Sequence, residues 1–258
     1  MFFPPAFDKS IALEAADLVD QAYDQFEHFK QGMPWILQGN YDTLGLLSAK
    51  PEGLLCRKEP FGFVAGNKAS GAVFVTFRET KSPEDWVSDF TFPQVPHPWG
   101  QAEEGFSHLY AQCSADVRAS VQGAGAAPGV FVTGHSLGAG LAVLATADLV
   151  NSGVASGAAM YSFAGPRVGD PGFAATFNSR VALAWRIVNT EDIVTTVPFA
   201  TPELFPDGHP HSAFGIMLML AHKFDYEHVG NPLSFSAHKG SIPANHGMQV
   251  YIDALKAP

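Results

Sequence analysis

The sequence has few basic residues and no long uninterrupted apolar run. Lysine and arginine number 15 against 25 aspartates and glutamates, so the formal net charge of the 258 residues is −10. An acidic chain without a Lys/Arg block argues against nucleic-acid binding and against electrostatic docking on anionic lipid, although a neutral oil surface stays open. The longest apolar runs, such as AFGIMLMLA at 213–221, are shorter than the roughly 20 residues that span a bilayer. No integral membrane segment is expected.

Cysteine is also scarce. Cys56 and Cys113 are the two cysteines, and neither lies in a C-x-x-C or a zinc-ligand spacing. They could pair, but two buried thiols are the simpler interpretation. The N-terminal MFFPPAFDKS has neither a basic start nor a 7–15-residue apolar stretch, so no signal peptide is expected. The location stays open, with cytoplasmic as the default and secretion as the alternative.

The remaining composition is that of a globular α/β chain. Hydrophobic residues make up 47%, with 25 glycines and 19 prolines, and no internal repeat or low-complexity linker divides the sequence, so 1–258 is expected to be one domain. Helices are expected over 8–31, 102–121, 137–151, about 171–180 and about 245–256, and strands over 61–65, 71–77, 130–134, 157–165 and 182–190. This alternation predicts βαβ units and a mostly parallel sheet flanked by helices.

A G-x-S-x-G pentapeptide stands between a predicted strand and a predicted helix. The segment VFVTGHSLGAGLA at 130–142 places Gly134 and Gly138 two residues before and after Ser136. Such a turn needs small residues at those positions, because a Cβ there would clash, and it lifts the serine hydroxyl above the sheet. An inert glycine-rich turn is the competing interpretation. The flanking strand and helix favour a nucleophile elbow.

A serine nucleophile needs a histidine base and an acid that orients the base, and behind such an elbow the acid precedes the histidine. Asp192 directly follows the predicted strand ALAWRIVNT, whereas Asp148 and Asp170 lie in or beside helices. Among six later histidines, His246 is expected on the loop that opens the terminal helix, and His238 is the second candidate. His135, beside the serine, is expected to face away from it.

Several separated segments together resemble the class 3 lipases, the fungal-lipase-like branch of the α/β-hydrolases. They are VFVTFRETKSPEDWVSDFTF, VFVTGHSLGAGLA, SFAGPRVGD, RIVNTEDIVTTVPF and YEHVGNPL with NHGMQVYI, in the family's order from about residue 60 to the C-terminus. The resemblance implies an α/β-hydrolase fold, carboxylic-ester hydrolysis and no metal or organic cofactor. It also implies a triad of Ser136, Asp192 and His246, with Tyr251 completing the family's late H-x-x-x-x-Y segment.

The same resemblance implies an oxyanion hole made by Thr80 and by the backbone N–H of Leu137. Thr80 ends the segment Arg78-Glu79-Thr80, in which the family usually has glycine where this chain has Glu79. A carboxylate beside a developing oxyanion opposes its charge. We therefore expect the Glu79 side chain to point away from the site, towards Arg78 or solvent.

Residues 81–96 resemble the family's lid. Trp86, Val87 and Phe90, with Phe92, give the stretch an apolar aspect that could open against an oil interface. A plain surface loop is the alternative. FGIMLML at 214–220 could line an acyl pocket or simply pack in the core.

These residues predict a triacylglycerol lipase or esterase that works through an acyl-enzyme. The expected substrate is an ester or acylglycerol, met at an oil–water interface or in solution, and the expected state is a monomer. An esterase for polar or aromatic, feruloyl-type esters is the alternative within the class. A non-catalytic binding protein of the same fold is the alternative from another class, although such proteins usually lack a triad member, and none is missing here.

Overall fold

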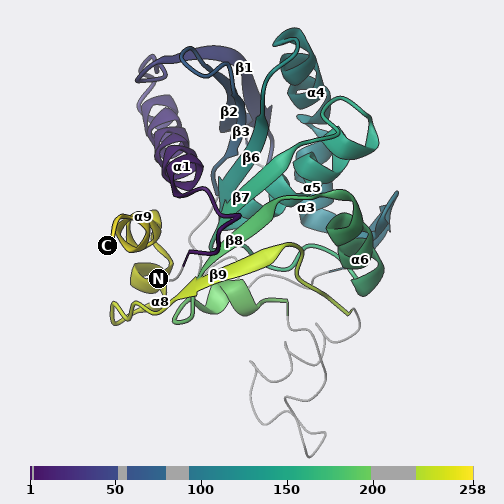
Figure 1. Ribbon diagram of the computed structural model, residues 1–258. Coiled ribbons are helices and arrows are strands. Elements are labelled where there is room, and N and C mark those ends of the chain that lie inside the picture. The colour runs from purple at the N-terminus through teal and green to yellow at the C-terminus, as the bar shows by residue number, and fades with distance from the viewer. Residues whose placement is uncertain (2, 52–56, 80–92, 199–224, 258) are drawn as a thin grey trace, which may run out of the picture.

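The computed structural model describes residues 1, 3–51, 57–79, 93–198 and 225–257 (Figure 1). The strands are β1 (Tyr41–Ala49), β2 (Glu59–Asn67), β3 (Val73–Phe77), β4 (Gln94–His97), β5 (Gly100–Glu103), β6 (Val130–His135), β7 (Ala159–Phe163), β8 (Ala184–Asn189) and β9 (Asn231–Phe235). The helices are α1 (Lys9–Lys30), α3 (Glu104–Ala111), α4 (Ser114–Gly123), α5 (Leu137–Asn151), α6 (Pro171–Arg180), the 3₁₀ turn η1 (Ile193–Thr196), α8 (Ile242–His246) and α9 (Met248–Lys256).

Seven strands form the main sheet in the order β1-β2-β3-β6-β7-β8-β9. The strands from β3 to β9 in this order run parallel, whereas β1 and β2 are antiparallel to their neighbours. The register pairs Phe77 of β3 with Gly134 of β6, and His135 with Phe163 of β7. The carboxyl ends of these strands therefore meet at one edge of the sheet, where ligands of such folds bind.

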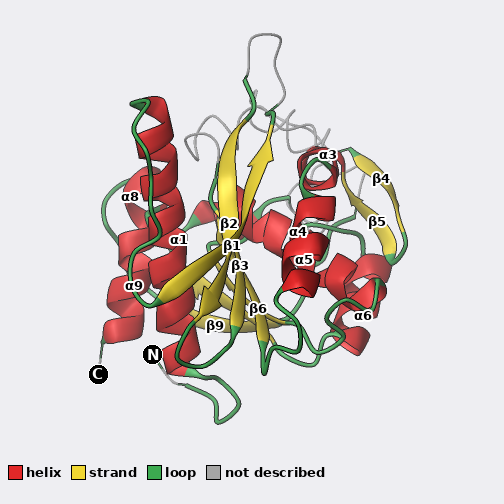
Figure 2. Ribbon diagram, turned by 90° about the horizontal axis from the view of Figure 1, so that it is seen from above, coloured by secondary structure: helices red, strands yellow, loops and turns green. Residues whose placement is uncertain are grey.

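Helices cover both faces of this sheet (Figures 1 and 2). On one face α1 contacts β2, β3 and β6, and α9 packs beside it. On the other face α5 lies against β3, β6 and β7, and α3 and α4 pack on α5. Side chains of β3 alternate between these layers, with Phe74 on the α1 side and Val75 and Phe77 on the α5 side, all fully buried. A strand buried on both faces is accordingly apolar almost throughout.

The expected alternation of strands and helices is present, but the structure adds strands at the sheet edges and divides two of the expected helices. The helix expected over 8–31 is α1, with Asp8 as the N-cap whose side chain accepts from the N–H groups of Ser10 and Ile11. The helix expected over 102–121 is instead two helices, α3 and α4, separated at 112–113. The terminal helix is also divided, at Gly247, between α8 and α9.

The edge strands β1 and β9 were not expected from the sequence. β1 is largely exposed, so it lacks a clear apolar pattern, and β9 begins with an Asn-Pro pair that is typical of a loop.

Within the described ranges, no helix is both long and apolar enough to cross a bilayer. Cys113 is a buried free thiol whose pKa is raised to about 12 by burial, and Cys56 lies outside the described residues.

Candidate active site

Ser136 occupies the sharp turn between β6 and α5. Its φ of 58° and ψ of −124° are rare for a residue with a side chain, so the turn holds backbone strain at this serine. A Cβ on Gly134 would lie 2.1 Å from the carbonyl oxygen of Gly138, and one on Gly138 would lie 2.7 Å from the carbonyl oxygen of Phe77. The two glycines therefore allow the close crossing of β6, α5 and the end of β3 that the elbow requires.

Leu137 is the first residue of α5, so its N–H has no intrahelical acceptor. The positive end of the α5 dipole lies beside Ser136, where it favours a developing negative charge. Ser136 itself is tied to the sheet by its N–H, which donates to the carbonyl of Phe163 across 3.0 Å. The second expected donor, Thr80, lies outside the described residues.

Asp192 and His246 form a buried pair past the carboxyl end of β8. Nδ1 of His246 lies 2.7 Å from Oδ2 of Asp192, and both residues are 1% exposed. Asp192 is the N-cap of η1, where its Oδ1 accepts the N–H of Val194 at 3.0 Å. Since Nδ1 donates to Asp192, Nε2 of His246 is the basic nitrogen, and it has no hydrogen-bond partner among the described residues.

The sequence placed His246 at the start of the terminal helix, and the structure corrects this detail. His246 is the last residue of the short helix α8. Asn189 at the end of β8 fixes this segment, because its side-chain amide donates to the carbonyls of Asn245 and Ala237 at 2.9 and 3.0 Å. Asn245 in turn donates to the carbonyl of Glu191 at 2.9 Å. These amides attach the histidine to the same strand end that carries Asp192.

His135 does not face away from the candidate site. Its Nε2 lies 2.8 Å from the carbonyl oxygen of His246, and the two imidazole rings are 4.7 Å apart. Its Nδ1 lies 2.7 Å from the hydroxyl of Tyr23 on α1. Burial and the neighbouring His246 place the pKa of His135 well below its usual range, so the ring is neutral. No sequence motif pointed to Tyr23, which is 112 residues away from His135.

The expectation for Glu79 is wrong. Its side chain is only 18% exposed and turns inward, with Oε2 3.9 Å from Nε2 of His246 and Oε1 2.9 Å from the Tyr23 hydroxyl. The guanidinium of Arg78 contacts only the backbone of Glu79, to whose carbonyl it donates, and it also donates to Glu59 and to the carbonyl of Pro60, each at 2.8 Å. Its carbon Cζ lies 3.5 Å from the ring centroid of Phe26. The ion pair with Glu59 and this cation–π contact hold Arg78 away from the Glu79 carboxyl.

Glu79, His135 and His246 each offer one potential ligand atom, and these atoms lie within 4.8 Å of one another. Both ring nitrogens of His135 already have hydrogen-bond partners, and Nδ1 of His246 is bonded to Asp192. The cluster is therefore built as a hydrogen-bond network, and we assign it no metal.

The other residues predicted for the site are either exposed, part of a separate hairpin, or outside the described residues. His238, the second candidate base, is 71% exposed and lies 3.3 Å from the carboxylate of Glu191. The expected lid residues Trp86, Val87 and Phe90, and the segment 214–220, lie outside the described residues. The last residues of the expected lid, from Gln94 onward, belong to β4, which pairs with β5 in a separate small hairpin.

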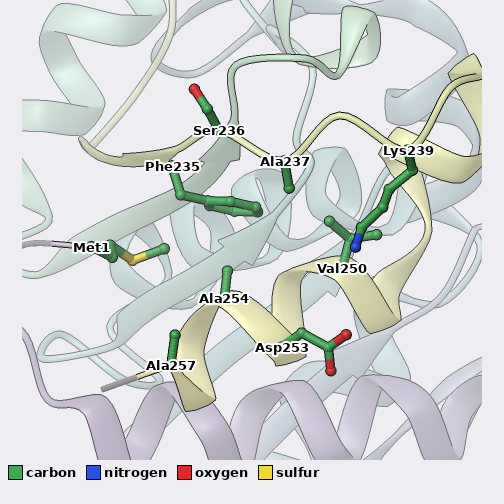
Figure 3. A pocket seen from close by; sticks show the side chains of 9 residues that line it. All are labelled: Met1, Phe235, Ser236, Ala237, Lys239, Val250, Asp253, Ala254 and Ala257. Carbon is green, nitrogen blue, oxygen red and sulfur yellow. The ribbon is translucent and has the colours of Figure 1, made fainter.

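A hollow of about 310 Å³ lies between β9 and α9 (Figure 3). Figure 3 shows Phe235 and Val250 on its walls and Lys239 at its rim. None of the three candidate catalytic residues lines it. It is therefore distinct from the site at the strand ends.

Comparisons with known proteins show which proteins this chain is similar to. A model of the family described as Lipase (class 3) matches residues 74–201. A phospholipase A1 of Oryza sativa subsp. indica is 28% identical over 214 residues, which cover 71% of this chain and 47% of that protein. A lipase of Rhizomucor miehei is 33% identical over 144 residues, covering 52% of this chain and 40% of that protein. The chain thus spans about half the length of the curated relatives it matches.

Solved structures share the fold. A lipase from Rhizopus microsporus var. chinensis superposes with a TM-score of 0.66 at 23% identity, over 90% of this chain and 76% of that one. The α/β-hydrolase fold expected from the sequence is thereby confirmed. The family match, the relatives and the fold agree that this chain resembles the class 3 lipases.

Proposed function

We propose that this chain is a serine carboxylic-ester hydrolase that acts on acylglycerols, with Ser136, Asp192 and His246 as its triad. The observation that carries the proposal is the buried 2.7 Å contact of Asp192 with Nδ1 of His246, which leaves Nε2 without a hydrogen-bond partner among the described residues. This nitrogen lies 3.9 Å from the Glu79 carboxyl, which also contacts Ser136 at the strained elbow. An acid that fixes the tautomer of a histidine next to such a serine is the arrangement that makes a hydroxyl nucleophilic.

In this mechanism His246 Nε2 takes the proton of the Ser136 hydroxyl as the serine oxygen attacks the ester carbonyl. The imidazolium that forms is stabilised by Asp192. The tetrahedral oxyanion accepts from the N–H of Leu137, and Thr80 is proposed as the second donor. His246 then protonates the leaving alkoxide, and a water molecule, deprotonated by the same nitrogen, hydrolyses the acyl-enzyme.

The substrate class rests on the relatives, whose names describe a lipase and a phospholipase A1. We further propose that 1–258 forms one domain, that the enzyme is a monomer, and that residues 81–96 cover the site and open at an oil–water interface. The apolar residues of that segment support this part of the proposal.

Labelling with a fluorophosphonate tests the reaction class, because the reagent reacts with an activated serine. We expect one adduct, on Ser136, and none in the Ser136→Ala variant. Ser234→Ala, which alters an exposed serine of β9, is the matched control and should label normally. Folded protein without an adduct on Ser136 would instead support a non-catalytic binding protein.

Rates on p-nitrophenyl esters of increasing acyl length, below and above substrate solubility, test the substrate. A rise in rate when the emulsion forms supports a lipase with an opening lid. A profile that does not change at the solubility limit, with faster hydrolysis of feruloyl-type esters, contradicts the acylglycerol assignment and supports an esterase.

A further inference from the structure

Glu79 lies where a network of buried polar groups from four parts of the chain meets. Its carboxyl follows β3 and faces Tyr23 of α1, His135 and Ser136 at the end of β6, and His246 of α8. Asp192 stands behind His246, and Glu59 of β2 neutralises Arg78. No sequence feature of the triad calls for a carboxyl here, so its role has to come from its contacts.

The proton positions in this network follow from its donors and acceptors. The carbonyl of His246 can only accept, so Nε2 of His135, 2.8 Å away, carries the hydrogen. In a neutral His135 the other nitrogen, Nδ1, is then an acceptor. The Tyr23 hydroxyl, 2.7 Å from Nδ1, must therefore donate its only proton to that nitrogen.

The Tyr23 hydroxyl has a second contact, with Glu79. Oε1 of Glu79 lies 2.9 Å from the same Tyr23 hydroxyl, whose proton is already committed to His135. An ionised Glu79 would place two acceptors against one proton in a buried site, which is costly. A protonated Glu79 donates to the Tyr23 oxygen instead, and every contact in the chain from Glu79 to the His246 carbonyl is then satisfied.

We propose that Glu79 carries its proton in the active enzyme and acts as the first donor of a chain, through Tyr23 and His135, that positions His246. This inference rests on the proposed esterase function. Loss of the proton would break the chain and put a negative charge next to the elbow, where the reaction develops an oxyanion. Glu79 is thus a positioning residue whose ionisation switches the site off as the pH rises.

The electrostatic surroundings support this state. Burial raises the pKa of Glu79, and this effect outweighs the lowering by His246, Tyr23, Ser136 and Arg78. Burial raises the pKa of Tyr23 well above its usual value, so its hydroxyl keeps a proton to donate. His135 is neutral, as the chain requires.

The test is the pH dependence of kcat/KM on p-nitrophenyl butyrate for the unmodified enzyme and for Glu79→Gln, whose amide donates at every pH. We expect the unmodified enzyme to lose about tenfold per pH unit above the pKa of Glu79, because one proton is lost. The Glu79→Gln profile should lack this alkaline decline. Tyr23→Phe should lower kcat with little change in KM, because it removes the middle of the chain.

Glu14→Gln is the matched control, because Glu14 of α1 accepts from the hydroxyl of Tyr41 in β1 at 2.9 Å and forms a second glutamate–tyrosine pair. The pH profile of kcat/KM for Glu14→Gln should equal that of the unmodified enzyme. An alkaline decline that is the same with Glu79→Gln overturns the proposal. So does a uniform loss of kcat at every pH in Glu79→Gln, which would mean that the carboxylate form supports catalysis.

A second readout does not depend on turnover. Infrared difference spectra of the unmodified protein against Glu79→Gln should show a protonated carboxyl band near neutral pH that disappears in alkali. Its absence overturns the inference even if the enzyme is active. If Ser136 takes no fluorophosphonate label while the band is present, the proposed function fails and the proton assignment stands.

Discussion

The hydroxyl of Tyr251 donates a hydrogen bond of 2.6 Å to Oδ2 of Asp192, the same oxygen that accepts from His246. Both residues are buried, and burial together with Asp192 raises the pKa of Tyr251 well above its usual value, so the phenol remains a donor. The tyrosine, five residues after the histidine, therefore holds the carboxylate in position from the opposite side.

Replacing Tyr251 by phenylalanine should lower kcat by about tenfold to 100-fold, because a hydrogen bond to a charged group contributes about 1.5–3 kcal/mol. KM on a soluble ester should change little, since Tyr251 and Asp192 are both buried. Tyr41→Phe, which removes the hydroxyl that pairs with Glu14, is the control. An unchanged kcat in Tyr251→Phe would show that the hydrogen bond does not position the acid.

Replacing Asp192 by asparagine should lower kcat by about 10⁴-fold, because the amide no longer fixes the His246 tautomer with Nε2 as the base. The rate of fluorophosphonate labelling should fall in parallel, since both reactions need the same base. Asp42→Asn, at an exposed ion pair with Lys68, should leave both rates unchanged. Equal labelling rates for Asp192→Asn and the unmodified enzyme would contradict the assigned role.

Alanine at Gly138 should destabilise the protein or prevent its folding. The new Cβ would lie 2.7 Å from the Phe77 carbonyl oxygen and 2.8 Å from the Arg78 backbone, so the end of β3 has to shift. Thermal unfolding measures the effect. Gly123→Ala, where a Cβ meets nothing within 4 Å, should not lower the melting temperature. Similar melting temperatures for the two variants would mean that the elbow tolerates a side chain.

The stability of the fold should fall in acid because of His228. Its pKa is lowered from 6.5 to about 3, first by burial and then by Arg186 and Arg167, while its Nε2 lies 2.8 Å from the Thr195 carbonyl. The unfolded chain binds the proton below pH 6.5 and the folded chain only near pH 3. The contribution of neutral His228 to the free energy of unfolding is therefore fully present above pH 6.5 and is lost progressively as the pH falls towards 3.

Urea unfolding at pH 7 and pH 4 checks this expectation. His228→Gln keeps a donor for the Thr195 carbonyl but cannot titrate, so its midpoint should fall less between the two pH values. His238→Gln, at a histidine that is 71% exposed, should behave like the unmodified protein. Equal acid losses in all three proteins would remove His228 as the cause.

The structure departs from the sequence-based expectations mainly at the edges of the sheet and around Glu79. Central strands such as β3 and β6 were predictable, because strands buried on both faces are apolar along most of their length. The edge strands β1 and β9 were missed, because one-sided burial leaves a weak pattern. Glu79 was misplaced because the sequence shows only its neighbours Arg78 and Thr80, and Arg78 is held by Glu59 of another strand.

The sequence by itself determined the elbow, since Gly134, Ser136 and Gly138 meet a local requirement for small residues around one turn. It also indicated Asp192 and His246, because chain order and strand ends are properties of the linear pattern. Only the tertiary structure decided what surrounds them. Tyr23 and Glu79 are 56 residues apart and meet beside His246 because α1 packs across the sheet. Such contacts depend on packing between distant segments, which no local pattern encodes.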